Sequence, residues 1–509
     1  MTEASTIPTT AEPDPRRWIT LGVLIATVVI VSMDSSILNV SIPTMMRDLD
    51  TTVPSLEWVI SGYSLTLASL LIIGGRLGDV FGHRRLFVVG LSLFGAGSLL
   101  AALAPNVAVL IVGEAVIEGI GAALMIPSTL ALLSASFQGR ERATAFAAWG
   151  AAMGAAVAFG PVIGGFLTTN YSWRWAFGIN VCIAPLAILG AMLFMRPGTP
   201  SGGRASIDAP GAALVGSGTF LVVFALSQGP TYGWLRPREA FHIGGLEVWP
   251  ASMPISVVSA AFLVGGALLT VFVRMELRKE RTGGDPLFEF SLMRYRTFRY
   301  GLTTMMIVSL GQLGMLFCLP LFLQSANDLS AQQNGLWLLP LGIGVIIGAQ
   351  GGGRLSQRVG VTNVIRGGFL LEVAALVVLI PALQPGVTFW RIMPSLLVYG
   401  IGTGVASSQL TNVVLSEIPR EKSGVAGGAQ STARQLGAAL GAAVIGTLLT
   451  VHTISSAVSS MQAAALPPGV TDRAVAGVEA MGGNWQPPPG LSAAQASTLE
   501  NPFDSAVAS

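Results

Sequence analysis

The chain has 509 residues, of which 52% are apolar and only 11% are charged, and its mean hydropathy is +0.67. Soluble domains carry about 25% charged residues, so this composition excludes a soluble globular protein of this size. The net charge of +2, from 28 basic and 26 acidic residues, gives no indication of nucleic-acid binding. The composition therefore predicts a multi-pass membrane protein.

Apolar segments near or above the roughly 20 residues that cross a bilayer follow a polar N-terminal stretch. That stretch lacks the apolar core and cleavage site of a signal peptide, so we expect residues 1–17 to form a retained cytoplasmic tail. The segments occur as six, then two, then five, and they cover approximately residues 18–42, 56–75, 86–104, 107–133, 144–168, 174–195, 209–228, 251–273, 300–323, 334–353, 364–383, 389–415 and 424–449.

Basic residues are distributed unequally between the predicted loops. With the N-terminus inside, 21 of the 28 Lys and Arg residues lie on the cytoplasmic side and six on the outer side. Cytoplasmic loops carry such an excess, so the sequence predicts this orientation. After residue 449 the chain becomes polar and rich in Pro and Gly, without a fourteenth apolar segment. Thirteen spans therefore predict an extracytoplasmic tail over residues 450–509.

A basic, glycine-rich hairpin joins the second and third apolar segments and is partly repeated in the second half. The first copy covers residues 74–85, and residues 353–360 repeat its Gly-Arg-Leu start and its final Gly. Such a repeat indicates a two-fold repeated transporter. The hairpin is either a gate between the two halves or a plain positive-inside anchor. The candidate gate residues are Gly75, Gly78, Asp79, Gly82, Arg84 and Arg85.

Three acidic residues lie at membrane depth in the first half. Asp34 falls in the first segment, and Glu114 and Glu118 lie four residues apart in the fourth, hence on one helix face. A carboxylate in hydrocarbon is costly, so it is usually functional, protonated or paired. We therefore expect proton coupling by Asp34, Glu114 and Glu118. The alternatives are a structural hydrogen bond for Asp34 and a water-facing position for Glu114.

The fifth segment contains a proline between glycines. Pro161 removes a backbone hydrogen bond, and the neighbouring glycines permit close packing of another helix. This pattern either has a role in transport or is ordinary small-residue packing. The residues of the candidate kink are Gly160, Pro161, Gly164 and Gly165.

Taken in chain order, these motifs resemble the 14-helix drug:proton antiporter family of the major facilitator superfamily. The resemblance covers roughly residues 18–450, and its elements are residues 33–43, Trp58, Tyr63, the first hairpin, residues 119–127, 160–165 and 173–180, then Pro320, Gln324, Pro340 and residues 424–441. It implies an all-α polytopic membrane protein with the major facilitator fold. Two six-helix bundles would be joined by a two-helix insertion, with the last helix missing here.

The resemblance also implies a division of the chain and roles for the motifs. The hairpin would latch the outward-facing state, the kink would belong to export, and Asp34 would take part in proton coupling. The sequence departs from the family at Ala115, where the pattern usually has an arginine, so the role of that arginine is not carried over.

The expected parts of the chain are an N-terminal bundle over 18–195, the inserted pair and a linker over 196–299, and a C-terminal bundle of five spans over 300–449.

Substrate is expected near the bilayer midplane between the bundles. An acidic face without the family's arginine would favour cationic compounds. Arg434 interrupts an otherwise small and apolar segment, either balancing a buried acid such as Glu372 or lying near the cytoplasmic end. Amide side chains at membrane depth, such as that of Gln312, either line a cavity or form hydrogen bonds between neighbouring helices. The expected cavity residues are Asp34, Glu118, Gln312, Glu372 and Arg434.

No enzyme motif is present in the sequence. The three histidines are far apart, and no phosphate loop, nucleophile motif or metal-ligand spacing occurs. Cys182 and Cys318 both fall inside predicted spans, which argues against a structural disulfide or a metal cluster. We therefore expect no metal and no cofactor, with the proton gradient as the energy source. The expected partners are a small-molecule substrate and the lipid bilayer, not nucleic acid, and the chain is expected to be a monomer.

The sequence thus predicts a proton-coupled multidrug efflux antiporter in the bacterial inner membrane. It would export lipophilic, cationic compounds. One alternative is an exporter of an endogenous metabolite, lipid or siderophore on the same scaffold. An alternative of another class is a truncated, non-transporting membrane scaffold. Substrate identity, proton stoichiometry, oligomeric state, the natural C-terminus and the choice between the two glutamates stay open.

Overall fold

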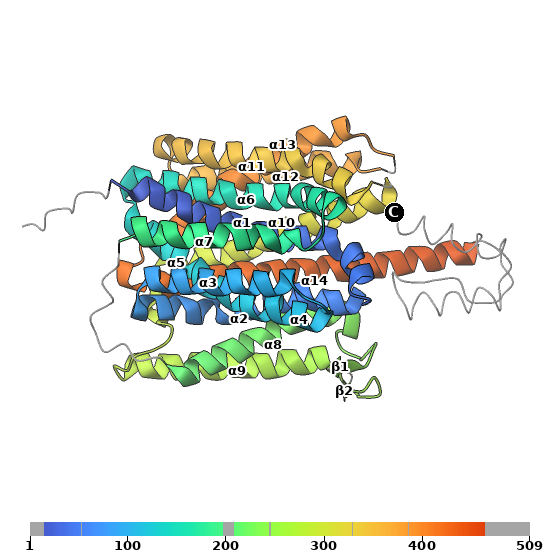
Figure 1. Cartoon of the computed structure of the whole chain (residues 1–509), viewed down its shortest axis with the longest axis horizontal. Helices are drawn as coiled ribbons and strands as arrows, with labels where there is room; N and C mark the ends of the chain where they lie inside the picture. The colour runs from blue at the N-terminus through green and yellow to red at the C-terminus, as the bar shows by residue number, and fades with distance from the viewer. Residues whose placement is uncertain are drawn as a thin grey trace, which may run out of the picture.

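The computed structural model describes residues 15–51, 53–196, 208–243, 246–327, 329–384 and 386–463. Within these ranges the chain is mostly helical, and its long helices run along a common axis (Figure 1). Each of the thirteen predicted segments overlaps a helix or a run of helices. By length and composition, ten described helices can cross a membrane, or eleven if one bent helix is included. The remaining two predicted spans are rich in Gly, Ser and Thr, which lower their hydropathy.

The first half of the chain packs as one group of helices. Helices α1, α6 and α7 contact one another, and α5 packs against α2 and α3. The fourth apolar segment is broken into α4, a π-helical stretch η1 and α5. The helices are α1 (Arg17–Asp48), α2 (Val53–Phe81), α3 (His83–Ala102), α4 (Val107–Ile111), η1 (Val112–Glu118), α5 (Gly119–Ser136), α6 (Gly139–Asn170) and α7 (Trp175–Phe194).

The second half forms a corresponding group. Helix α13 packs against α11 and α12, and α10 packs against α14. Helix α14 runs through the molecule and projects beyond the other helices at one end (Figure 1). The elements are α10 (Arg296–Ala326), α11 (Ala331–Val359), α12 (Val361–Leu379), the 3₁₀ turn η3 (Ile380–Ala382), α13 (Phe389–Val414), the 3₁₀ turn η4 (Arg420–Lys422) and α14 (Ser423–Ala463).

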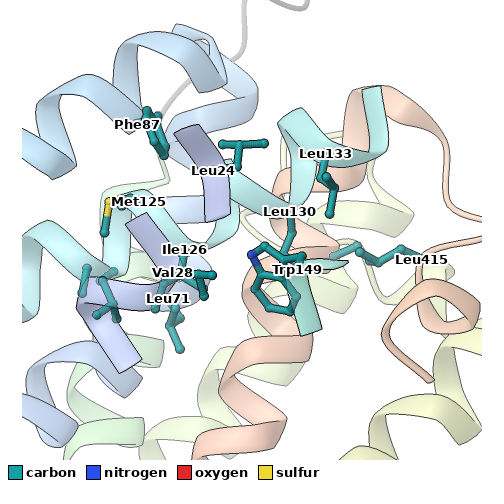
Figure 2. Close-up of a cluster of buried hydrophobic side chains, with 14 of the residues drawn as sticks. Leu24, Val28, Leu71, Phe87, Met125, Ile126, Leu130, Leu133, Trp149 and Leu415 are labelled. Atoms are coloured by element: carbon teal, nitrogen blue, oxygen red, sulfur yellow. The ribbon is translucent and has the colours of Figure 1, made fainter. Parts of the chain in front are cut away.

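Several helix pairs join the halves: α6 packs against α11 and α13, and α14 packs against α2 and α5. The largest cluster of buried apolar side chains crosses this boundary. It includes Phe87, Leu130 and Trp149 from the first half and Leu415 at the end of α13 (Figure 2). Burial of such side chains contributes about 1.5–3 kcal/mol each when water is the alternative. The halves therefore share one apolar core at the end where α2 finishes and α14 begins. We call this end cytoplasmic, following the predicted orientation.

Helices α8 (Ala209–Tyr232) and α9 (Val257–Arg281) form a pair on one side of the molecule, beside α2 and α14 (Figure 1). An ionic contact ties the pair at its cytoplasmic end. Asp208 caps α8 by accepting a 3.0 Å hydrogen bond from the Gly211 N–H, and it forms an ion pair with Lys279 of α9. Burial alone would raise the pKa of the Asp208 carboxyl, but its hydrogen bonds outweigh burial and hold that pKa below its ordinary value.

The structure differs from the predicted segments in one strand hairpin and in two helix boundaries. An antiparallel hairpin of β1 (Phe241–Ile243) and β2 (Leu246–Trp249) connects α8 to α9, so the predicted span starting at 251 begins at Val257 instead. Ser256 caps α9 through its side chain, which fixes that start. Helix α14 continues past 449 to Ala463, because no Gly or Pro interrupts residues 451–463. Residues 1–14, 197–207 and 464–509 of the predicted tails and linker lie outside the described residues.

Candidate functional site

The three predicted proton-coupling residues meet inside the first half. Asp34 on α1 is 2% exposed, and Glu114 and Glu118, four residues apart on η1, are fully buried. One carboxylate oxygen from each lies within 4.8 Å of the others. The water-facing alternative for Glu114 is therefore wrong, because packed helices surround its carboxyl group. We call Asp34, Glu114 and Glu118 the carboxyl triad.

Only two oxygens of the carboxyl triad have hydrogen-bond partners. Asp34 Oδ1 accepts a 2.8 Å bond from Asn180 Nδ2 on α7, and Glu118 Oε1 accepts a short bond from the Ser98 hydroxyl on α3. Within the described residues, the other four oxygens have none: Asp34 Oδ2, Glu118 Oε2 and both oxygens of Glu114. Carboxylates so close in a dry interior repel one another unless protons or a cation neutralise them. Among the described residues, this is the group whose geometry suits a cation.

The local sequence explains how the triad comes together. A π-helical stretch widens the helix between α4 and α5, and such stretches recur at functional sites. Gly97 on α3 faces this stretch: a Cβ there would lie 2.7 Å from Glu118 Cγ and 2.7 Å from the Gly113 carbonyl oxygen. Only glycine allows this approach, which brings Ser98 within hydrogen-bond reach of Glu118.

A small cavity of about 40 Å³ lies between the two halves. The predicted cavity residues Gln312 and Arg434 line it, whereas the triad members Asp34 and Glu118 lie inside the first half and do not. Its lining comes from α5 and α6 on one side and from α10, α13 and α14 on the other, and it consists of Leu130, Trp149, Met153, Met305, Ser309, Gln312, Ser407, Thr411, Gln430, Ser431 and Arg434.

Arg434 and Glu372 do not form the ion pair that the sequence suggested as one option. Glu372 on α12 accepts a 3.0 Å hydrogen bond from Gln312 Nε2, which also donates to the Ser407 hydroxyl at 3.2 Å. Arg434 instead donates to the Met153 sulfur at 2.7 Å. Glu372 therefore lies next to the cavity lining, and Gln312 stands between it and the cavity.

The first hairpin connects the two halves at the cytoplasmic end. Asp79 accepts hydrogen bonds from the backbone N–H groups of Gly424 (3.0 Å) and Val425 (2.9 Å), the first turn of α14. A carboxylate is favourable there because the helix dipole is positive at its N-terminus. Gly75 lies against the same turn: a Cβ on it would be 2.3 Å from the Gly424 carbonyl oxygen. His83 Nε2 also lies 2.9 Å from Asp79 Oδ1.

The other candidate gate residues lie within the first half. Gly78 faces the His83 ring, and Gly82 precedes α3 with φ +94°, a left-handed conformation that favours glycine. Arg84 donates to the carbonyl oxygens of Ala191 and Met192 at the end of α7. Arg85 is exposed. Of the candidate gate residues, Gly75 and Asp79 are thus the ones that contact α14 of the second half.

Helix α6 bends by 41° between Glu141–Ala156 and Phe159–Asn170. The bend lies one turn before Pro161, where the missing N–H leaves the carbonyl four residues earlier without its helical bond. Beyond the bend, Gly164 packs on Ile37 of α1 and Pro161 packs on Gly335 of α11. Gly160 and Gly165 are both buried. The kinked segment therefore lies between one helix of each half.

Several residues of these sites were not predicted from the sequence. Ser98, Trp149, Met153 and Gln430 are ordinary residues within apolar segments, and only the fold brings them to the triad or the cavity. One signal was available for Gln430: it lies four residues before Arg434, so both fall on one face of α14.

Comparison with known proteins identifies the family. The model of the Major Facilitator Superfamily matches residues 24–442. The chain belongs to the Major Facilitator Superfamily. It is therefore a multi-pass membrane transporter by family, as the motifs indicated, and not an enzyme.

Its relatives within the superfamily include exporters and resistance proteins. The probable actinorhodin transporter of Streptomyces coelicolor is 35% identical, covering 86% of this chain and 74% of the relative. The puromycin resistance protein of Streptomyces alboniger is 31% identical, covering 87% and 83%. The human organic anion transporter MFSD10 is similar in structure, with a TM-score of 0.59 and 15% identity, and the match covers 86% of this chain and 94% of that one. At that identity, the structural match concerns the fold alone.

Proposed function

We propose that this superfamily member is a proton-coupled exporter of lipophilic compounds in the bacterial inner membrane. The observation that carries the proposal is the carboxyl triad, in which four buried oxygens have no hydrogen-bond partner among the described residues. Each carboxyl can hold a proton there and release it when water or an opposite charge arrives. The resistance and export functions in the names of its relatives support the class of substrate.

Proton binding and substrate binding would occur at separate places. The triad lies inside the first half, and the cavity lies between the halves. The Tyr63 side chain on α2 lies within electrostatic range of all three triad carboxyls and of Arg434. A change of charge at the triad would therefore act on Tyr63, which also interacts with the cavity residue Arg434, since charges in a low-dielectric interior interact over several ångströms.

The conformational cycle would use the contact between Asp79 and α14. This contact joins α2 to the start of α14 at the cytoplasmic end, and in the proposed cycle it would break when that end opens to load substrate. Proton release to the cytoplasm would then accompany return to the closed form. We propose a monomer without a cofactor as the working unit, because each half contributes one side of the cavity.

The expected preference for cations depended on Asp34 and Glu118 lining the substrate cavity. Both lie inside the first half, so their charges do not provide a docking surface for a cationic substrate. We propose instead that the triad serves coupling for every substrate. The charge preference then depends on the side chains that line the cavity.

A transport assay tests this proposal. The full chain is reconstituted in liposomes with an imposed pH gradient, and uptake of three matched fluorescent probes is followed: anthracene-9-carboxylate, its carboxamide and 9-(aminomethyl)anthracene. We expect at least one probe to be taken up in exchange for protons faster than into protein-free liposomes with the same pH gradient, and a protonophore should abolish this difference. Transport of no probe, or transport insensitive to the protonophore, would contradict the proposal.

A further inference from the structure

Arg434 presents a guanidinium group to the cavity between the two halves. It lies on α14, eleven residues after Ser423 at the start of that helix, and its side chain lines the cavity. Its hydrogen bond goes to the thioether sulfur of Met153. A thioether is a weak, uncharged acceptor, so this contact leaves the positive charge without compensation.

No carboxylate reaches this guanidinium in the part of the chain that the structure describes. The ion pairs found there do not include Arg434, and Glu372 is bonded to Gln312 instead. The triad carboxyls lie inside the first half and do not line the cavity. Arg434 is half-buried. A charge partly withdrawn from water is normally paired, because desolvation without a partner costs free energy.

The cavity lining offers a second set of open contacts. Trp149 Nε1 and Gln430 Oε1 are buried and have no hydrogen-bond partner among the described residues. The Trp149 side chain lies beside Leu130, as Figure 2 shows, and Met153 and Met305 add flexible apolar surface. An aromatic ring fits such a surface, and an acidic group on that ring would accept hydrogen bonds from both Trp149 and Arg434.

The geometry points to a substrate site for lipophilic aromatic acids, in which Arg434 binds the anionic group and Trp149 contacts the ring. This inference rests on the proposed export function and names the charge class of its substrate. The anion supplies the counter-charge that the protein does not provide. Carboxylates and ionised phenols both have the required chemistry.

The cavity must widen to hold such a compound. At about 40 Å³ it has room for one water molecule. Its two sides belong to different halves, so rocking of the halves apart enlarges it without unpacking either one. The closed form described here then corresponds to a state between loading and release.

A binding measurement without any proton gradient tests the inference. The full chain is placed in lipid nanodiscs, and the anisotropy of the three anthracene probes is titrated, with protein-free nanodiscs subtracted. We expect the carboxylate to bind at least tenfold more tightly than the carboxamide or the amine. Equal binding of the three probes, or tighter binding of the amine, would overturn the inference. This comparison uses the unmodified protein, so it does not depend on a variant that folds.

Substitutions then assign the preference to Arg434. Arg434→Gln should remove the tenfold preference, and Arg434→Lys should retain part of it because the charge remains. Arg366→Gln is the matched control, since Arg366 is an exposed arginine on α12 outside the cavity. A preference that survives in Arg434→Gln would contradict the assignment.

The binding and transport assays separate the two proposals. Selective binding of the carboxylate without proton-dependent transport would support the site and contradict the proposed coupling. Proton-dependent transport of the amine without selective binding of the carboxylate would do the reverse.

Discussion

The Asp79 carboxylate on α2 accepts a 3.0 Å hydrogen bond from the backbone N–H of Gly424 at the start of α14. The two residues are 345 positions apart in the chain. One carboxylate thus caps a helix and joins the two halves, so the same bond stabilises a helix end and the closed cytoplasmic end. This contact favours the gate over the plain membrane anchor, and the choice between them stays a prediction.

Removing the charge of Asp79 should weaken this contact. Asp79→Asn keeps the shape but replaces one acceptor oxygen, and loss of a helix cap costs about 0.5–2 kcal/mol. We expect a lower maximal transport rate with KM changed less than twofold, measured from initial rates in liposomes. Glu421→Gln, an exposed acid next to the same helix start, is the control. A large rise in KM at an unchanged maximal rate would argue against a gate.

Adding one methyl group at Gly75 should have a similar effect for a steric reason. A Cβ there would lie 2.3 Å from the Gly424 carbonyl oxygen, so α2 and α14 must separate. Gly75→Ala should therefore lower the maximal rate and destabilise the closed form, seen as faster labelling of cytoplasmic-end cysteines. Gly351→Ala on α11 is the matched control, because a Cβ at Gly351 meets nothing within 4 Å. Equal rates in both variants would remove the steric argument.

Glu118→Gln tests whether the triad serves coupling or substrate recognition. Glu118 lies inside the first half, bonded to Ser98, so we expect the variant to reduce proton-driven transport of every transported probe to the same degree. The ratio of rates between probes is the quantity to compare with the unmodified protein. A selective loss for the amine would place Glu118 in the substrate path, as the sequence first suggested.

The ionic contact of the inserted helix pair has a defined pH dependence. Because the folded-state pKa of Asp208 lies below its ordinary value, its stabilisation is present above about pH 3.9 and is lost as the pH falls through the lowered pKa. Asp208→Ala should lower the thermal unfolding temperature in detergent at pH 7, since loss of the helix cap alone costs about 1 kcal/mol. The difference from the unmodified protein should shrink towards pH 3. A constant difference across that range would contradict the assignment.

The sequence predicted the helical segments well because each needs only a long apolar run, which hydropathy reports directly. It also predicted the carboxyl triad, since acids at membrane depth are conspicuous and Glu114 and Glu118 share a helix face. It did not predict the partners of the triad, Asn180 and Ser98, because hydrogen bonds between distant helices depend on packing. The same reason explains Trp149 and Met153, which become cavity residues only when α6 meets the second half.

One expectation was wrong, and a second stays a prediction. The hairpin of β1 and β2 lies in a polar connection whose strands are too short for a clear alternating pattern. The placement of Asp34 and Glu118 in the substrate cavity assumed that every membrane-depth acid faces the space between the halves. The structure shows that the first half has an interior of its own, large enough to enclose three carboxyl groups.

Asp34→Asn in reconstituted protein is the most direct test of the central claim that the carboxyl triad carries the coupling proton. The amide keeps the shape of Asp34 and cannot carry the proton. Transport of the anthracene probes is measured with and without an imposed pH gradient, and proton flux is recorded with an entrapped pH dye. We expect the variant to lose gradient-driven transport and substrate-dependent proton flux while it binds the same probes as the unmodified protein. Gradient-driven transport equal to that of the unmodified protein, with an unchanged proton flux, would contradict it.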